Sequence, residues 1–244
     1  MIIRNRILTL LFFSTIFINS LFGQSDTIII INGNDSLKAI GKYVNKLEQG
    51  PWEYFYFNGA KQSKGSFLNG KPTGEWINWR PDGQILNKIN YDKKGLKQGF
   101  FIEYLYRLNE THEMFFVNDT LEGKIIWRHF DGHKIIEGYY KKGLRDGKWN
   151  WYHPNGKIES DGKFLDDKFH GHWIYYFDNG KKDNEGDFTG GLKEGEWIFY
   201  FNEAERVRAK GKYLNDMKEG EWVQYNVDGS IKSVEYYEND LLKK

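Results

Sequence analysis

The chain has 244 residues, an aromatic share of 18%, 27 glycines, 4 prolines and no cysteine. The lack of cysteine excludes disulfides, thiolate metal sites and a lipid-modified N-terminal cysteine. The formal net charge is +1 and no block of basic residues is present, which argues against nucleic acid or an anionic membrane surface as the main partner. The abundance of aromatic residues and glycines favours strands and tight turns over helices.

Residues 1–23 have the pattern of an export signal. Two arginines give a positive start, and an apolar run from Ile7 to Phe22 with five polar interruptions follows. The small residues Gly23 and Ser25 then offer cleavage sites. An uncleaved anchor is the alternative, but this run is shorter than the roughly 20 apolar residues that span a bilayer. We therefore expect an exported chain, in the periplasm, at the cell surface or secreted, without stable membrane insertion after cleavage.

Residues 24–40 lead into a repeated pattern. The β-branched run Thr27–Ile31 precedes the turn signal Asn32-Gly33, and residues 36–40 continue into Gly41. An array of repeats needs an atypical end-piece that covers its exposed edge. We expect residues 24–40 to form this N-terminal capping segment.

Residues 41–244 repeat one phrase, most clearly between Gly147 and Lys157. It consists of a glycine, any residue, a tryptophan, an aromatic residue three positions later and, in most copies, Asn-Gly or Asp-Gly. The anchoring glycines lie 24 or 25 residues apart; they are Gly50, Gly74, Gly99, Gly123, Gly147, Gly171, Gly195 and Gly220. A fixed period of this size indicates an array of one supersecondary element instead of a globular enzyme fold.

Each repeat contains two extended runs. The first carries an aromatic residue, at Tyr43, Phe67, Tyr91, Phe115, Tyr140, Phe164, Phe188, Tyr213 and Tyr237, and the second carries the tryptophan. A polar turn joins the two runs, and the Asn-Gly or Asp-Gly pair that follows the second accepts positive φ at both turn positions. We expect an all-β fold, an elongated antiparallel β-meander of about eight 24-residue β-hairpin repeats.

Two neighbouring repeats depart from the pattern. Phe101 replaces the tryptophan in the third repeat, whereas Ile125 replaces it in the fourth and the tryptophan moves to Trp127. We interpret residues 99–127 as a bend, a place for a partner, or a degraded stretch of the array.

Side chains alternate along a strand, which divides the repeat residues between two faces. One face carries an aliphatic and an aromatic residue, one and three positions after the tryptophan, and this regular ladder is the expected core. The other, which we name the tryptophan face, carries the tryptophans and a variable residue two positions later. Our candidate binding face is made of Trp127, Trp149, Trp151, Trp173, Tyr175, Trp197 and Phe199. The alternative is that curling of the sheet or self-association also buries this face.

The run from Gly65 to Gly74, Gly-Ser-Phe-Leu-Asn-Gly-Lys-Pro-Thr-Gly, resembles the MORN repeat, the membrane occupation and recognition nexus motif. The best-known form has Gly-x-Gly where this chain has Gly-x-Trp, as at Trp76. The chain is therefore more similar to the bacterial MORN-repeat variant, a family often labelled as the antitoxin of toxin–antitoxin systems. The resemblance implies a scaffold or a binding surface for proteins or lipids.

The sequence carries no convincing catalytic or metal-binding motif. His129 and His133 flank a predicted turn, while His170 and His172 occupy positions that hold glutamate in other repeats. Those glutamates recur along the array, whereas glycosidase chemistry needs two carboxylates focused in one cleft. Gly190-Gly191 lacks the lysine and the helix of a phosphate loop. We expect no catalytic residue, no metal and no cofactor.

These observations favour an exported, non-enzymatic binding or scaffold protein whose partner is an unidentified protein. The first alternative is an antitoxin or immunity-type protein that neutralises a partner toxin, and an export signal fits a role in the envelope better than one in the cytoplasm. The second alternative is carbohydrate or cell-wall binding through surface aromatics. Exposed, coplanar tryptophans would favour the sugar, and a continuous apolar strip with an open edge strand would favour a protein partner.

Overall fold

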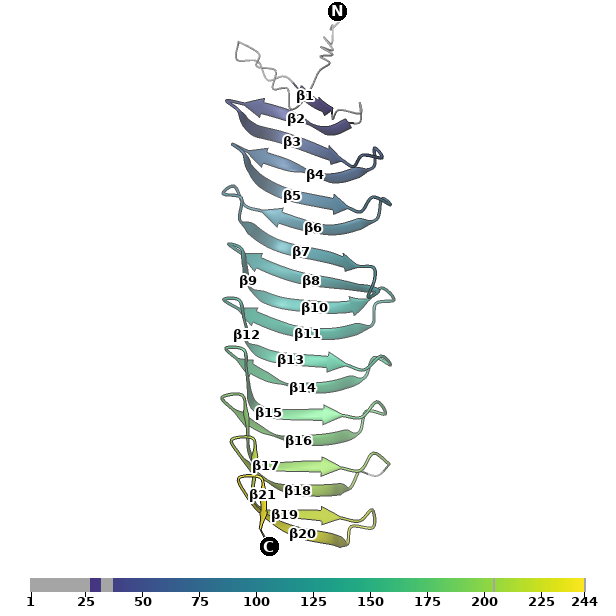
Figure 1. Cartoon of the computed structure of the whole chain (residues 1–244), viewed down its shortest axis with the longest axis vertical. Helices are drawn as coiled ribbons and strands as arrows, with labels where there is room; N and C mark the ends of the chain where they lie inside the picture. Colours follow the sequence, from purple (N-terminus) through teal and green to yellow (C-terminus); the bar gives the residue numbers. More distant parts are fainter. Residues whose placement is uncertain (1–26, 32–36, 204, 244) are drawn as a thin grey trace, which may run out of the picture. The chain divides into compact units, whose positions relative to one another are not determined.

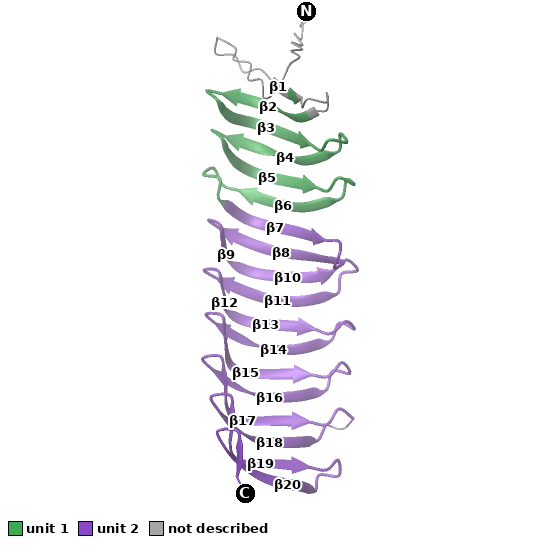
Figure 2. Cartoon of the chain, viewed as in Figure 1, with its two compact units in different colours: residues 1–96 green, residues 97–244 purple. Residues whose placement is uncertain are grey.

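The computed structural model describes residues 27–31, 37–203 and 205–243. The predicted signal at residues 1–23 and the turn at Asn32-Gly33 lie outside these residues. The described part of the chain is built from strands and turns, and it contains no helix that could cross a membrane. It divides into two compact units, residues 1–96 and 97–244 (Figure 2).

Unit 1 is an antiparallel meander in which each strand pairs with the next (Figure 1). Its strands are β1 (Thr27–Ile31), β2 (Leu37–Val44), β3 (Leu47–Phe55), β4 (Lys61–Leu68), β5 (Lys71–Trp79) and β6 (Ile85–Tyr91). The predicted capping segment therefore contributes β1 and the beginning of β2.

Unit 2 continues the same strand-turn-strand rhythm. Its strands are β7 (Lys97–Leu105), β8 (Glu110–Val117), β9 (Thr120–Leu121), β10 (Gly123–His129), β11 (Lys134–Lys141), β12 (Leu144–Arg145), β13 (Gly147–Tyr152), β14 (Ile158–Leu165), β15 (Lys168–Tyr176), β16 (Lys182–Thr189), β17 (Leu192–Tyr200), β18 (Val207–Leu214), β19 (Met217–Tyr225), β20 (Ile231–Glu238) and β21 (Leu241–Lys243). The short strands β9 and β12 are the first parts of tryptophan-type strands that break before the anchoring glycine. The predicted all-β antiparallel meander of hairpin repeats is confirmed.

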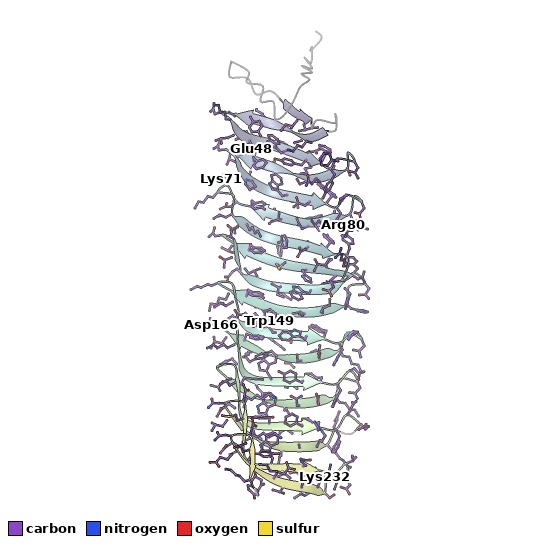
Figure 3. The ribbon with its side chains drawn as sticks, in the orientation of Figure 1. Glu48, Lys71, Arg80, Trp149, Asp166 and Lys232 are labelled. Atoms are coloured by element: carbon purple, nitrogen blue, oxygen red, sulfur yellow. The ribbon has the colours of Figure 1, made fainter. Side chains whose placement is uncertain are left out.

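Short two-residue turns form one edge of each unit. Both residues of such a turn have positive φ, as at Asp166 (50°) and Asp167 (66°). Asparagine and aspartate tolerate this conformation better than other side chains because they bond locally to the backbone. In Figure 3, Lys71 and Arg80 lie at opposite edges of unit 1, and Asp166 and Lys232 lie at opposite edges of unit 2.

The short turns also dock onto the repeat before them. The Asp167 N–H donates to the Arg145 carbonyl oxygen (3.0 Å), and the Arg145 N–H donates to Asp167 Oδ1 (2.9 Å). Asp216 makes the same reciprocal pair with Lys193, and Asp240 makes it with Lys218. The polar residues of these turns thus hold successive hairpins in register.

The Asn-Gly loops at the other edge differ from the expected turn, because only their glycine has positive φ, 81° at Gly156. The Gly156 N–H donates to the His153 carbonyl oxygen, and the His153 N–H donates to the Lys157 carbonyl oxygen, both at 2.8 Å. This is a longer loop, in which a type I turn is followed by a left-handed glycine. The expectation of positive φ at both positions of Asn-Gly is therefore wrong. The extra residue shifts the register beside the loop, between Trp151 and Tyr152.

The core lies on the tryptophan face, where each anchor tryptophan packs on a glycine of the preceding strand. A β-carbon on Gly162 would lie 2.1 Å from Trp173 Cδ2, so only glycine leaves room for the indole. The Trp173 indole N–H donates to the Lys163 carbonyl oxygen (3.0 Å), beside the register shift at Gly162. The same packing joins Trp52 to Gly41, Trp76 to Gly65, Trp149 to Gly138, Trp197 to Gly186 and Trp222 to Gly211.

The opposite face does not hold the core that its aliphatic and aromatic ladder suggested. Of the aliphatic residues that follow the anchor position, only Val223 is buried, with 8% of its surface exposed. The others and the aromatic residues two positions later are half-buried; they include Ile174, Ile198, Tyr176 and Tyr200. The assignment of the core to this face is therefore wrong.

The fourth repeat retains the packing with a different pair of residues. Ile125 takes the tryptophan position and is 1% exposed, and Met114 takes the glycine position and packs against the cluster that contains Ile125. A larger side chain at the glycine position thus accompanies a smaller one at the tryptophan position. Residues 99–127 therefore remain packed, and they remain in register because β8 pairs with β10 without a shift.

The predicted position of the aromatic residue in this repeat is wrong by one residue. Gly99 pairs with Phe116, as Gly147 pairs with Phe164, so Phe116 and not Phe115 is the equivalent aromatic residue. The extra residue that shifts the spacing lies in the turn between Asp92 and Leu96. That turn is longer than the two-residue turns, with the Asp92 N–H donating to the Leu96 carbonyl oxygen (2.8 Å).

The contact between glycine and indole predicts a strong energetic coupling. Gly162→Ala should destabilise unit 2 by about 1–3 kcal/mol because the new methyl group displaces the Trp173 indole. The backbone of Gly162 is outside the left-handed region, so this cost reports a clash and not backbone strain. In a Trp173→Ile background the same substitution should cost much less, as the natural pair Met114 and Ile125 indicates. A double-mutant cycle from urea unfolding measures the coupling, and additive effects would contradict this account.

Candidate functional site

The structure places the predicted binding residues on one face but buries three of them. Trp149, Trp173 and Trp197 are 3%, 1% and 0% exposed, so the alternative of a buried tryptophan face holds for these three. The physical reason is that a glycine backbone covers one side of each indole. Neighbouring rings close much of the rest; Phe164, for example, lies 5.3 Å from Trp173 in a T-shaped contact. The expectation that these three rings lie on the surface is wrong.

The residues two positions after the anchor remain half-buried, and they form a continuous row of rings with the tryptophans. Trp151 lies 5.7 Å from Trp173, Tyr175 lies 6.5 Å from Trp197, and Phe199 lies 6.0 Å from Trp222, measured between ring centroids. All three half-buried rings pack against the same core cluster. They are the part of the predicted site that can still touch a partner.

Trp127 occupies a more polar part of the face. Its ring stacks on His112 at 4.1 Å with an interplanar angle of 7°, and His112 Nε2 lies 3.0 Å from Glu110 Oε2. Trp127 is opposite Ile136 in the sheet, and Ile136 is in turn opposite Trp151. The structure therefore brings Trp127 next to the row of rings, although its own neighbours differ.

Basic side chains line the aromatic row on the side of the short turns, a feature that the sequence analysis missed. Arg145 Cζ lies 4.1 Å from the Phe164 ring centroid, Lys193 Nζ lies 4.4 Å from that of Trp197, and Lys218 Nζ lies 4.6 Å from that of Trp222. Each stands four residues before an anchor position. Burial lowers the pKa of the Lys193 ammonium, while Asp216 raises it less. The recurrent Lys or Arg at this position was the signal available in the sequence.

The opposite face of unit 2 carries a polar cluster around Glu185. Its carboxylate accepts a hydrogen bond from the Tyr200 hydroxyl (2.5 Å) and from Lys182 Nζ (2.8 Å), and it lies 3.2 Å from His172 Nε2. Burial raises the pKa of Glu185, but the hydrogen bonds from Lys182, Tyr200 and His172 outweigh it and the pKa is lowered. Burial and the neighbouring Asp161 carboxylate raise the pKa of Tyr176 to about 12.

These polar groups form a hydrogen-bonded cluster on the surface of the sheet. Within the described residues, no group of three or more histidine, aspartate or glutamate side chains is arranged to hold a metal ion. The predicted absence of catalytic and metal-binding residues stays a prediction. The chemistry that the described faces offer is contact with a partner through rings, cations and hydrogen bonds.

Comparison with known families matches four segments to the model described as MORN repeat variant. They are residues 48–69, 72–93, 145–166 and 169–189, two in each unit and roughly a third of the chain together. No curated protein matches the sequence. The matched segments fall on repeats with a tryptophan at the anchor position, and they support a MORN-repeat protein.

The lowered pKa of Glu185 predicts how the stability of the chain depends on pH. The ionised carboxylate stabilises the fold above its ordinary pKa of 4.5, and this contribution disappears as the pH falls through the lowered folded-state value. Glu185→Gln should therefore unfold at lower urea concentration than the natural chain at pH 7, and the difference should shrink below pH 4.5. Glu196→Gln, at an exposed position of the same face, is the control. A difference at Glu185 that is independent of pH would contradict the assignment.

Proposed function

We propose that this chain is an exported, non-enzymatic scaffold that binds a protein partner through the tryptophan face of unit 2. The observation that carries the proposal is the row of half-buried rings at Trp151, Tyr175 and Phe199. Half-buried aromatic residues in a row leave more apolar surface than a face that meets only water needs. MORN-repeat architecture is compatible with a scaffold or binding protein.

The burial of the indoles favours a protein partner over a carbohydrate. A sugar ring stacks on an exposed, flat aromatic face, and the sugar-binding alternative needed exposed rings at Trp149 and Trp173. Both are almost completely buried. The rings that remain accessible are stacked or tilted against the buried tryptophans, with Trp151 at 29° to Trp149 and at 43° to Trp173. Such a surface suits the irregular apolar side chains of a protein better than a sugar plane.

An antitoxin or immunity-type role is the special case in which the partner is a toxin. It rests on the resemblance to the bacterial MORN-repeat variant, and no described residue favours it over another partner. Relief of toxicity on co-expression with the captured partner would identify this case.

Partner capture tests the proposed face. Trp151→Leu combined with Tyr175→Leu keeps apolar volume but removes the two rings, and it should abolish capture of the partner from envelope extract. The matched control is Tyr152→Leu combined with Tyr176→Leu, which changes the same strands on the opposite face and should leave capture intact. Circular dichroism and urea unfolding verify that both variants fold. Equal capture by the two variants, or loss only in the control, would reject this face as the binding surface.

Export is tested separately by the N-terminus of the protein recovered from cells. We expect the chain outside the cytoplasm to begin at Gln24 or Asp26, because cleavage after Gly23 or Ser25 follows the signal pattern. Mass spectrometry of the intact protein from periplasmic, surface and medium fractions measures this. A cytoplasmic chain that retains residues 1–23 would contradict export.

A further inference from the structure

The tryptophan face is hollowed where the row of rings ends. A shallow pocket of about 280 Å³ lies over Ala209, with Phe199 and Trp222 among its walls. Ala209 is opposite Phe199 on one neighbouring strand and Gln224 on the other. The preceding repeats have Trp151, Tyr175 and Phe199 where this one has Gln224. The pocket therefore exists because Gln224 leaves space that a ring fills in those repeats, over the small side chain of Ala209.

Glu235 closes the far side of the pocket. It is opposite Trp222 in the sheet and stands two residues before Tyr237, a position that is glycine in most other repeats. Gln224 Nε2 donates to Glu235 Oε1 (3.3 Å), and the Tyr237 hydroxyl donates to Glu235 Oε2 (2.8 Å). Both oxygens of this carboxylate thus have donors from the protein itself.

Two basic side chains border the same pocket. Lys218 Nζ lies over Trp222 and 4.7 Å from the Tyr237 ring centroid, and Arg208 Cζ lies 5.9 Å from the Phe199 centroid. Arg208 reaches this face because the register shift between Phe199 and Tyr200 leaves it without a strand partner. Among the described residues, neither cation forms an ion pair with a carboxylate. Together with Lys193, one repeat earlier, they place three cations at this end of the face, where Glu235 lines the pocket and Asp216 lies close enough to Lys193 to raise its pKa.

We infer that this pocket, together with Lys193, binds an acidic segment of a protein partner in an extended conformation. The inference rests on the proposed function, because it specifies the chemistry of the partner at one end of the same face. Arg208 and Lys218 pair with carboxylates of the segment, and an apolar side chain between them enters the space over Ala209. Charge complementarity supplies the specificity, since the pocket has rings for its walls and unpaired cations at its rim.

The spacing of the cations fits a peptide. Lys193 and Lys218 occupy equivalent positions in successive repeats, which are two strands or about 10 Å apart. A peptide in the extended polyproline II conformation rises about 3.1 Å per residue with three residues per turn, so side chains three positions apart lie on the same side and about 9 Å apart. Acidic residues three positions apart can therefore meet both lysines, with an apolar residue between them.

An acidic polysaccharide fits the pocket less well. Its rings would need an open aromatic face, but Trp222 is 4% exposed. The backbone of Gly211 covers one side of the Trp222 indole, and the Lys218 ammonium lies 4.6 Å from the ring centroid. The pocket therefore offers cations to an acidic sugar but no exposed aromatic ring on which the sugar could stack.

Binding of defined peptides to the full chain tests this inference. The probe is a fluorescein-labelled ten-residue peptide with two glutamates three positions apart and a leucine between them; a second peptide has glutamines in their place. Fluorescence anisotropy should show binding of the glutamate peptide that weakens with salt, and at least tenfold weaker binding of the glutamine peptide. Arg208→Gln combined with Lys218→Gln should weaken the glutamate peptide about tenfold, which corresponds to about 1.4 kcal/mol.

The matched control is Lys163→Gln combined with Lys212→Gln. It removes the same charge from exposed positions on the opposite face and should leave binding unchanged. Thermal unfolding verifies that both double variants fold. If Lys218→Gln impairs folding, Arg208→Gln alone, at an exposed position, replaces the double variant in the binding comparison.

Three results would overturn the inference. They are equal binding of the two peptides, equal losses in the two double variants, and preferential binding of polygalacturonate. Partner capture separates this failure from that of the proposed function. If the Arg208 and Lys218 variant still captures the partner but the peptides do not bind, only the acidic-segment inference fails. If the ring variant Trp151→Leu with Tyr175→Leu also retains the partner, the proposed face fails with it.

Discussion

Each anchor tryptophan occupies a volume that any side chain on the facing glycine would fill, and most features of the structure follow from this exclusion. An indole buried in this way contributes on the order of 4–6 kcal/mol by area, as an upper estimate. The hydrogen bond from the indole N–H, which every anchor tryptophan except Trp52 makes, contributes about 1 kcal/mol. Packing therefore decides the position of the ring, and the hydrogen bond orients it. The glycine and the tryptophan lie on the two strands of one hairpin, as at Gly162 in β14 and Trp173 in β15. The Trp173 ring also packs against Trp151 of the preceding repeat and Phe188 of the following one, so stability in each unit is a property of neighbouring repeats.

The sequence predicted the strands well and the buried face badly, for related reasons. The constant period and the runs of strand-forming residues are visible in the sequence itself, so the hairpins could be predicted from it. In a sheet without a second layer, both faces carry aromatic and charged side chains. The alternation of side chains along a strand therefore does not tell which face is buried. The missing signal was the glycine two residues before most of the aromatic residues, such as Gly162 before Phe164. This glycine lies within a strand and not in a turn. Its lack of a side chain becomes significant only when the pairing of β14 with β15 is known, because that pairing places the indole against it.

The site shows the same limit. Trp151, Tyr175 and Phe199 could be selected as a row because they recur at one position, and the structure places them in contact with a common cluster. Arg208 could not be placed, because a register shift beside a long loop moves it onto the tryptophan face. Nor could the pocket be foreseen, since it depends on Ala209 lying opposite Gln224 of the neighbouring strand. Features that depend on one residue of register lie beyond what a repeat pattern specifies.

Glu235 changes what the edge of β20 can accept. An open sheet edge is a template on which a further strand, from the same molecule or another copy, can grow. In this chain such growth in the native packing needs a glycine to receive the next indole, and Glu235 presents a carboxylate there, held by Gln224 and Tyr237. A tryptophan on a strand that paired with β20 beyond Tyr236–Glu238, the part that β21 covers, would have to bury that charge against its ring, an unfavourable contact that none of the glycine positions imposes. The carboxylate thus disfavours continued packing of this kind at the edge of β20, and its replacement by glycine would remove that barrier together with the hydrogen bonds from Gln224 and Tyr237.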